Sequence, residues 1–167
     1  MGWTAGHLEG RFTARAAIEF EFDAEFAARV VDAVRYGQVI YAAIRSSDGK
    51  EVFGLVLLAE RRNGVLFTKP INEDMGPVED HCPARILDQL TEPSNNNARE
   101  WRKRCRARLA RPHPRLGQKV IFVKPLRFTN GDVHGALTFQ GGSRFRSADG
   151  TLYHIRSWRE LDYSVEA

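Results

Sequence analysis

The residues with the clearest chemical potential are basic side chains that crowd the middle of the chain. Residues 99–127 contain 11 Lys or Arg against 1 Asp or Glu, whereas residues 1–98 contain 10 against 15 and residues 128–167 contain 4 against 5. Guanidinium groups pair with phosphates or carboxylates through two parallel hydrogen bonds, and arginine suits such planar contacts better than lysine does. The pattern predicts a binding surface made by Arg99, Arg102, Lys103, Arg106, Arg108, Arg111 and Arg115.

Three interpretations of this basic run stay open at the level of sequence. The run binds nucleic acid directly, it binds an acidic protein surface, or it is a solvated helix face that the acidic residues 1–98 balance. Both binding interpretations require that the guanidinium groups point outward. They also require that carboxylates of residues 1–98 do not neutralise them.

A different chemistry would centre on Glu73, Asp74, His81 and Cys82. A cysteine nucleophile needs a base and surroundings that lower its pKa, and Cys82 lies at a predicted helix start. His81 is its neighbour in sequence, so the two side chains need not face each other, and no glycine-rich oxyanion turn follows. We therefore interpret Cys82 and Cys105 as reduced, buried thiols and expect no enzymatic activity and no cofactor. The spacing of Cys, His and acidic residues matches neither a zinc site nor a calcium loop, so no metal is expected.

Hydrophobic periodicity predicts an α+β fold whose first part is an antiparallel meander. Runs of strand-forming residues cover 30–34, 39–44, 52–58 and 65–68, with turn signals at Tyr36-Gly37, Asp48-Gly49 and Asn63-Gly64 between them.

Two to three helices accompany this sheet. One is expected after Thr13, with extended chain over residues 18–23, where apolar residues alternate, and one after Pro83. The last begins at Asn95–Asn97 and runs to about Ala110, with an apolar stripe of Ala98, Trp101, Cys105 and Leu109.

The remainder of the chain predicts a second domain. Short strands near 119–123, 137–139, 144–146 and 152–155 alternate with the turn signals Asn130-Gly131, Gly141-Gly142 and Asp149-Gly150. Such spacing is typical of a small SH3-like β-barrel. With Arg111-Pro112-His113-Pro114 as the linker, the expected domains are 1–111 and 115–167.

The hydropathy pattern excludes an obvious membrane segment. No run of 18 or more apolar residues is present, and the start of the chain lacks the basic and apolar stretches of a secretory signal. The expectation is a cytoplasmic protein with no membrane contact. Its oligomeric state is left open.

Four groups of residues carry a resemblance to a known family: Gly2-Trp3-Thr4, Glu73-Asp74-Met75-Gly76-Pro77, Cys82-Pro83 with Ile86–Thr91, and Trp101-Arg102 with Cys105. Together they resemble an uncharacterised bacterial domain-of-unknown-function family common on phages, plasmids and integrative elements. The likeness covers residues 1–106. Lys69-Pro70-Ile71-Asn72 departs from the family's usual aromatic-Lys-Asp run.

The resemblance implies a mobile-element context, in which genes of this size often encode counter-defence proteins. The expected function is therefore an accessory protein that binds and blocks a host defence complex, as an anti-CRISPR or anti-restriction inhibitor, through the basic surface. The alternative is a nucleic-acid-binding accessory factor of a phage or integrative element. A third hypothesis is an enzyme that uses Cys82 and the acidic loop.

Overall fold

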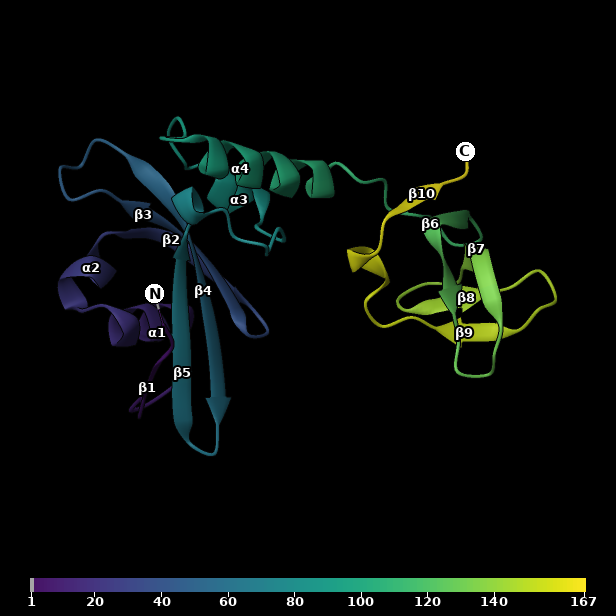
Figure 1. The fold of residues 1–167 in the computed structure, drawn as a ribbon, viewed down its shortest axis with the longest axis horizontal. Helices are drawn as coiled ribbons and strands as arrows, with labels where there is room; N and C mark the ends of the chain where they lie inside the picture. The colour runs from purple at the N-terminus through teal and green to yellow at the C-terminus, as the bar shows by residue number, and fades with distance from the viewer. Residues whose placement is uncertain (1) are drawn as a thin grey trace. The chain divides into compact units, whose positions relative to one another are not determined.

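Consecutive hairpins build the first part of the chain into one antiparallel sheet. The computed structural model describes residues 2–167, and the chain divides into two compact units, Met1–Ala110 and Arg111–Ala167 (Figure 1). Each unit contains one five-stranded antiparallel sheet, and the four short helices all belong to the first unit. The α+β class predicted from the sequence is confirmed.

The sheet of the first unit has the strand order β1-β5-β4-β3-β2. Its central strands are joined by tight turns, and at the β4–β5 turn Asn63 and Gly64 both have positive φ values of 50° and 81°. This is the turn geometry that an Asn-Gly pair favours between antiparallel strands. The strands are β1 (Thr4–Gly6), β2 (Val30–Tyr36), β3 (Val39–Arg45), β4 (Val52–Arg62) and β5 (Val65–Asn72).

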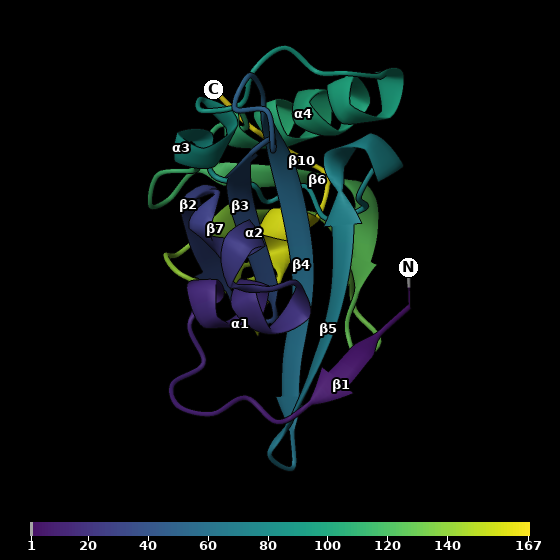
Figure 2. The same cartoon turned by 90° about the vertical axis from the view of Figure 1, so that its left-hand side faces the viewer.

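Helices cover both faces of this sheet, because β3 and β4 are apolar on both sides. Ile40 and Ile44 face a core that contains Ile18 of α1 (Ala14–Glu21). Tyr41 faces the other core, which contains Trp101 of α4 (Asn96–Leu109). Figure 2 shows α1 and α2 (Ala24–Ala28) in front of the sheet. The 3-10 turn η1 (Glu73–Met75) and α3 (Ala84–Leu87) complete the unit.

Two predictions for the first unit are wrong: the extended chain over residues 18–23, and the number of two to three helices. Residues 18–23 are not extended, because α1 continues to Glu21 and Asp23 then caps α2 by accepting a 2.6 Å hydrogen bond from the Phe26 amide. Alternating apolar residues in a short segment fit a helix as well as a strand when one side packs on a core. The number of helices is thus four.

The second unit is a sheet with the strand order β10-β6-β7-β8-β9. A single cluster of aromatic and aliphatic side chains, which includes Phe122, Phe139, Phe145 and Trp158, fills its inner side. The elements are β6 (Lys119–Arg127), β7 (Val133–Phe139), β8 (Arg144–Arg146), β9 (Leu152–His154), the 3-10 turn η2 (Trp158–Glu160) and β10 (Tyr163–Val165).

This unit differs from the predicted SH3-like barrel. Within residues 2–167 no strand pairing joins the edge strands β9 and β10, so the sheet is not closed. The pairing of β6 with β7 is also interrupted between Ile121 and Leu126 and resumes with Leu126 opposite His134. The closely spaced turns predicted the strands correctly but could not fix whether the edges meet.

Among residues 2–167, no helix combines the length and the apolar character needed to cross a membrane.

Candidate nucleic-acid interface

The basic run of the sequence lies mainly on α4, whose orientation is set by its apolar side. Asn95 caps the helix by accepting a 2.9 Å hydrogen bond from the Ala98 amide, and Ala98, Trp101 and Cys105 are fully buried. Leu109, expected in the same stripe, is 48% exposed, so the buried side ends at Cys105. Basic side chains occupy the borders and the outer side of the helix.

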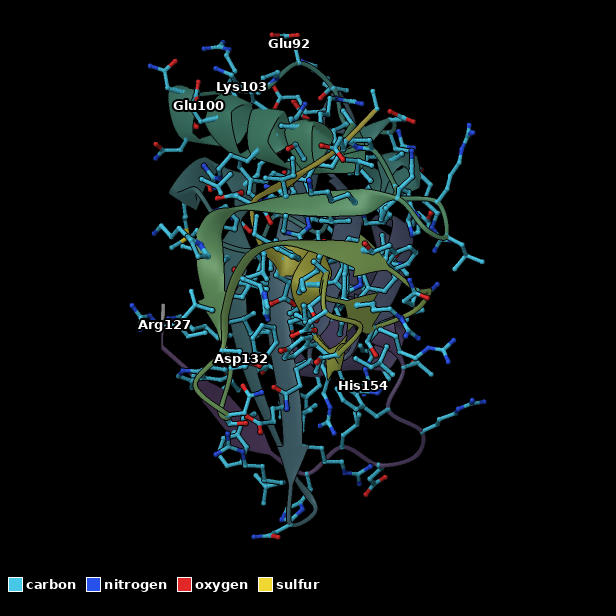
Figure 3. All side chains as sticks on the ribbon, turned by 90° about the vertical axis from the view of Figure 1, so that its right-hand side faces the viewer. Glu92, Glu100, Lys103, Arg127, Asp132 and His154 are labelled. Atoms are coloured by element: carbon cyan, nitrogen blue, oxygen red, sulfur yellow. The ribbon has the colours of Figure 1, made fainter. Side chains whose placement is uncertain are left out.

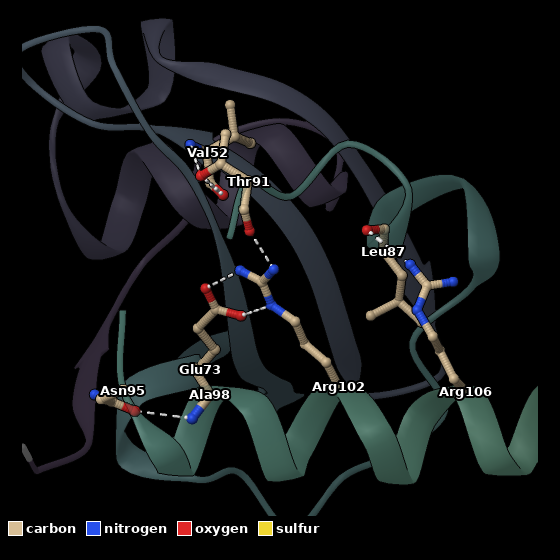
Figure 4. A network of polar contacts seen from close by, with 8 residues as sticks. All are labelled: Val52, Glu73, Leu87, Thr91, Asn95, Ala98, Arg102 and Arg106. Atoms are coloured by element: carbon tan, nitrogen blue, oxygen red, sulfur yellow. Dashed lines mark hydrogen bonds and ion pairs between the residues drawn. The ribbon is translucent and has the colours of Figure 1, made fainter. Parts of the chain in front are cut away.

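Arg102 lies at the border and points inward. Its Nε and Nη2 atoms donate 2.7 Å hydrogen bonds to the two carboxylate oxygens of Glu73, and Nη1 donates to the Thr91 carbonyl (Figure 4). The side chains of Arg102 and Glu73 are only 13% and 4% exposed. Arg102 therefore neutralises a buried carboxylate and is not available to an external ligand.

Two further guanidinium groups of α4 also face carboxylates of residues 1–98. Arg106 Nη1 lies 3.1 Å from Asp88 Oδ1, and Arg108 Nη1 lies 3.3 Å from Asp80 Oδ1. Both binding interpretations of the run required that such pairs be absent. For Arg102, Arg106 and Arg108 this requirement is not met.

Among residues 2–167, the other four predicted residues form no ion pair with a carboxylate of residues 1–98. Arg99 donates a 2.7 Å hydrogen bond to the neutral Asn96 side chain, and Lys103 projects from the outer side of α4 beside Glu100, at 4.0 Å (Figure 3). Arg111 belongs to the second unit, where it pairs with Asp162 at 2.8 Å. Arg115 also lies in the second unit and is exposed. The seven residues are thus divided between the two units, five on α4 and two in the second unit.

Counting charge by unit changes the electrostatic description of the chain. Residues 1–110 contain 16 Lys or Arg and 16 Asp or Glu, a net charge of 0. Residues 111–167 contain 9 against 5, a net charge of +4, which is the formal net charge of the whole chain. The carboxylates around α4 cancel its charge, so the uncompensated charge belongs to the second unit.

The outer side of the second unit's sheet displays part of this charge. In β8, Phe145 is buried while Arg144 and Arg146 on either side of it are exposed, as expected for neighbours on a strand. Arg144 is paired with His154 of β9. Arg146 is paired with Thr138 of β7, and Thr138 is paired with Lys119 of β6, so these side chains lie on the same side of the sheet.

These side chains are largely free of carboxylates. Within residues 2–167 neither Arg144 nor Arg146 forms an ion pair, and the only side-chain hydrogen bond of Arg146 goes to the Gly150 carbonyl at 3.3 Å. Lys119 is the exception, because its Nζ atom lies 3.4 Å from Glu166 Oε1 in an exposed pair like that of Arg106 with Asp88. Arg156, two residues beyond His154, is exposed as well. We call Lys119, Arg144, Arg146 and His154 the outer basic face.

From the sequence, we selected the basic run between residues 99 and 115 and did not identify this face. The signal that could have identified it is the Arg144-Phe145-Arg146 triplet, in which a buried aromatic residue separates two basic ones. In a strand that pattern places both arginines on the same exposed side. Lys119 belongs to the same side but can be assigned only once the β6–β7 register is known.

The cluster considered for catalysis does not form a nucleophilic site. Cys82 is completely buried, and burial raises the pKa of its thiol far above its usual value. A thiol in such surroundings holds its proton and is a poor nucleophile. The backbone amide of His81 donates to the Tyr41 hydroxyl at 3.3 Å, Glu73 is bound to Arg102, and Asp74 is exposed. Within residues 2–167 no three His, Cys, Asp or Glu side chains gather closely enough to hold a metal ion.

Comparison with known proteins identifies one family. Residues 92–158, from the segment before α4 to the start of η2, match the family described as Domain of unknown function (DUF6927). The match includes Arg144, Arg146 and His154 of the outer basic face. The resemblance expected from the sequence covered residues 1–106. The match shares only residues 92–106 with that range. No curated protein and no solved structure matches the chain significantly.

Proposed function

We propose that the protein is a binding module that contacts the phosphate backbone of nucleic acid through the outer basic face. The observation that carries the proposal is the pair Arg144 and Arg146, which share one exposed side of β8 and have no carboxylate partner within residues 2–167. Guanidinium groups without partners bind phosphate oxygens through paired charge-assisted hydrogen bonds. Lys119 on β6 lies on the same side of the sheet, beside Glu166 at 3.4 Å.

The spacing of the face supports backbone contacts over base recognition. Arg144 and Arg146 are two residues apart on a strand, a separation of about 6.8 Å. The aromatic residues of the neighbouring strand positions, Phe139, Phe145 and Tyr153, are buried on the other side of the sheet. Contacts of this kind give affinity with little sequence preference.

In this proposal the contact surface is the outer basic face and not α4. The protein is still expected to act by binding and not by catalysis. Blocking a host defence complex stays a prediction, and it would use the same face if the bound surface of that complex were acidic or carried nucleic acid. The two functions are separated by whether the isolated protein binds nucleic acid.

The direct test is binding of fluorescently labelled 20-mers of DNA and RNA, single-stranded and duplex, measured by anisotropy. With about three phosphate contacts, the affinity should fall by about 20-fold for single strands and about 40-fold for duplex DNA between 50 and 200 mM salt. Arg144→Ala/Arg146→Ala should lower the slope of log affinity against log salt by about 1.4 to 1.8.

The matched control is Arg99→Ala/Lys103→Ala, which removes two exposed charges from α4 without breaking an ion pair to residues 1–98. This variant should bind like the unmodified protein. Loss of binding in the α4 variant with retention in the β8 variant would overturn the proposal. So would the absence of salt-dependent binding to all four probes.

A further inference from the structure

A recess of about 160 Å³ lies on the sheet of the first unit, far from the outer basic face in sequence. Four side chains line it: Trp3, Glu60, Arg62 and Phe67. Two are aromatic, one is a carboxylate and one is a guanidinium. This combination offers flat apolar surface together with both a hydrogen-bond acceptor and a donor.

Strand register explains why these residues share one side of the sheet. Phe67 of β5 is paired with Glu60 of β4 on one side and with Ala5 of β1 on the other. Arg62 lies two residues after Glu60, and Trp3 lies two residues before Ala5. Alternation along a strand therefore directs all four side chains to the same face. The recess lies over the paired strands β4 and β5, with Trp3 contributed by the segment just before β1.

Trp3 is the unusual member of this set. Its side chain is 54% exposed, whereas Trp101 and Trp158 are 0% and 2% exposed. The indole nitrogens of those two residues donate hydrogen bonds to backbone carbonyls, as buried tryptophans normally do. Trp3 instead presents its ring at the mouth of a cavity, where a second planar ring can stack on it.

The charges around the recess decide which class of ligand fits. Arg62 Nε lies 2.5 Å from Glu60 Oε1, so these two groups neutralise each other. Lys69 lies on the same side of β5 as Phe67, because it is paired with Leu58, two residues before Glu60. The three ionic groups sum to one positive charge. An organic cation would meet a net positive charge here, whereas a planar ring that carries a phosphate would meet a complementary one.

We propose that the recess binds a nucleotide, with the base stacked on Trp3 beside Phe67 and the phosphate directed toward Arg62 and Lys69. The Glu60 carboxylate accepts hydrogen bonds from amino or ring N–H groups at the edge of the base. The Arg62 side chain is 69% exposed against 22% for Glu60, so it can turn toward a phosphate while Glu60 stays in place. The nucleotide is either free or part of a single strand, since both present the same ring and phosphate.

The test uses the full-length protein and adenosine monophosphate, with calorimetry for affinity and tryptophan emission as a local reporter. Because Trp3 is the one tryptophan of the chain that is exposed, quenching of the red edge of the emission reports on the recess. When an aromatic side chain that stacks on a base is removed, the binding affinity falls by about 5- to 150-fold. Trp3→Ala should weaken binding within this range, and Trp3→Phe should retain most of it.

Arg62→Ala should weaken binding of adenosine monophosphate by about 10-fold while leaving adenosine unaffected, since only the former carries the phosphate. The matched control is Arg61→Ala, on the other side of the same strand, whose side chain donates instead to the Leu8 carbonyl at 3.4 Å. Single-stranded oligoadenylate distinguishes the two forms of the ligand. If the recess binds a nucleotide within a strand, oligoadenylate should bind more tightly per site than adenosine monophosphate.

Affinity for adenosine monophosphate weaker than about 1 mM, equal binding by Trp3→Ala, or stronger quenching by choline than by the nucleotide would each overturn this proposal. The Arg144→Ala/Arg146→Ala variant keeps the result separate from the proposed function. That variant should bind the mononucleotide normally even where its salt-dependent binding to long strands is reduced.

Discussion

Arg102 holds the buried carboxylate of Glu73 through two parallel 2.7 Å hydrogen bonds, although the two residues are 29 positions apart in sequence. The pair fixes α4 against the turn η1 that follows β5. A third bond from Arg102 to the Thr91 carbonyl ties in the segment before the helix, and Thr91 in turn accepts from the Val52 amide with its side chain (Figure 4). Arg102 is thus a structural residue of the first unit.

Replacing Arg102 with Ala should destabilise the protein strongly, because it leaves the Glu73 carboxylate buried without a cation. Removing one partner of a buried pair typically lowers the free energy of unfolding by about 3–5 kcal/mol. Urea denaturation followed by circular dichroism measures the change. Arg99→Ala, one turn earlier on the same helix, should stay within about 0.5 kcal/mol of the unmodified protein. A loss of less than about 1 kcal/mol in Arg102→Ala would show that the pair is not structural.

Gly54 should not tolerate a side chain. A Cβ atom at this position would lie 2.8 Å from Cζ3 and 3.1 Å from Cη2 of the Trp101 ring. Trp101 is completely buried, so it has no free space into which to move. Gly54→Ala should therefore lower the free energy of unfolding by about 1–3 kcal/mol. Gly135→Ala in β7, where no atom lies within 4 Å of the added Cβ, should have no such effect.

Stability should fall at alkaline pH because of the two buried thiols. Burial raises the pKa of Cys82 well above its ordinary value and that of Cys105 to about 12. In the unfolded chain these thiols ionise from about pH 8.5, whereas the folded protein keeps their protons, so unfolding releases protons above that pH. The free energy of unfolding should then decrease by up to about 1.4 kcal/mol per pH unit for each thiol.

The measurement is urea denaturation between pH 7 and pH 10. Cys105→Ala should give a flatter decline, even if its stability at pH 7 is lower, since the slope depends on titration and not on packing. An unchanged slope in this variant would contradict the assignment of the pH dependence to the thiols.

The hydroxyl group of Tyr153 should contribute to the stability of the second unit. The hydroxyl donates to Asp132, and this bond raises the Tyr153 pKa. Because the one hydroxyl proton is used there, His134 Nε2, 2.9 Å away, must be the donor in its contact with Tyr153. Tyr153→Phe should lower the melting temperature, with a loss of about 1–2 kcal/mol. Tyr36→Phe is the control, since the Tyr36 hydroxyl makes no side-chain hydrogen bond within residues 2–167.

Periodicity and turn chemistry predicted those parts of the fold that depend on local sequence. The α4 cap at Asn95 and the buried positions Ala98, Trp101 and Cys105 follow from spacing alone. The edge strands β1 and β10 were missed because each has only three residues, too few to show alternation, and each exists through pairing with a longer strand. Closure of the second sheet depends on contacts between its edges, which turn spacing does not determine.

The candidate site was harder to predict than the fold, because a charge count along the chain contains no information about partners. Arg106 and Arg108 look identical to Arg144 and Arg146 in sequence. The first two face Asp88 and Asp80, which precede them by 18 and 28 residues, and only tertiary structure brings them together. The last two have no carboxylate opposite them in the sheet.

The balance of charge within the first unit has a practical consequence for handling the protein. A specific cleavage after Ala110 would release a fragment that is electrically neutral near pH 7 and a fragment that carries all four excess positive charges. A cation-exchange resin at low salt would retain the second fragment and let the first pass through. The excess charge behind the isoelectric point near 9.3 of the intact chain would then lie on the smaller piece.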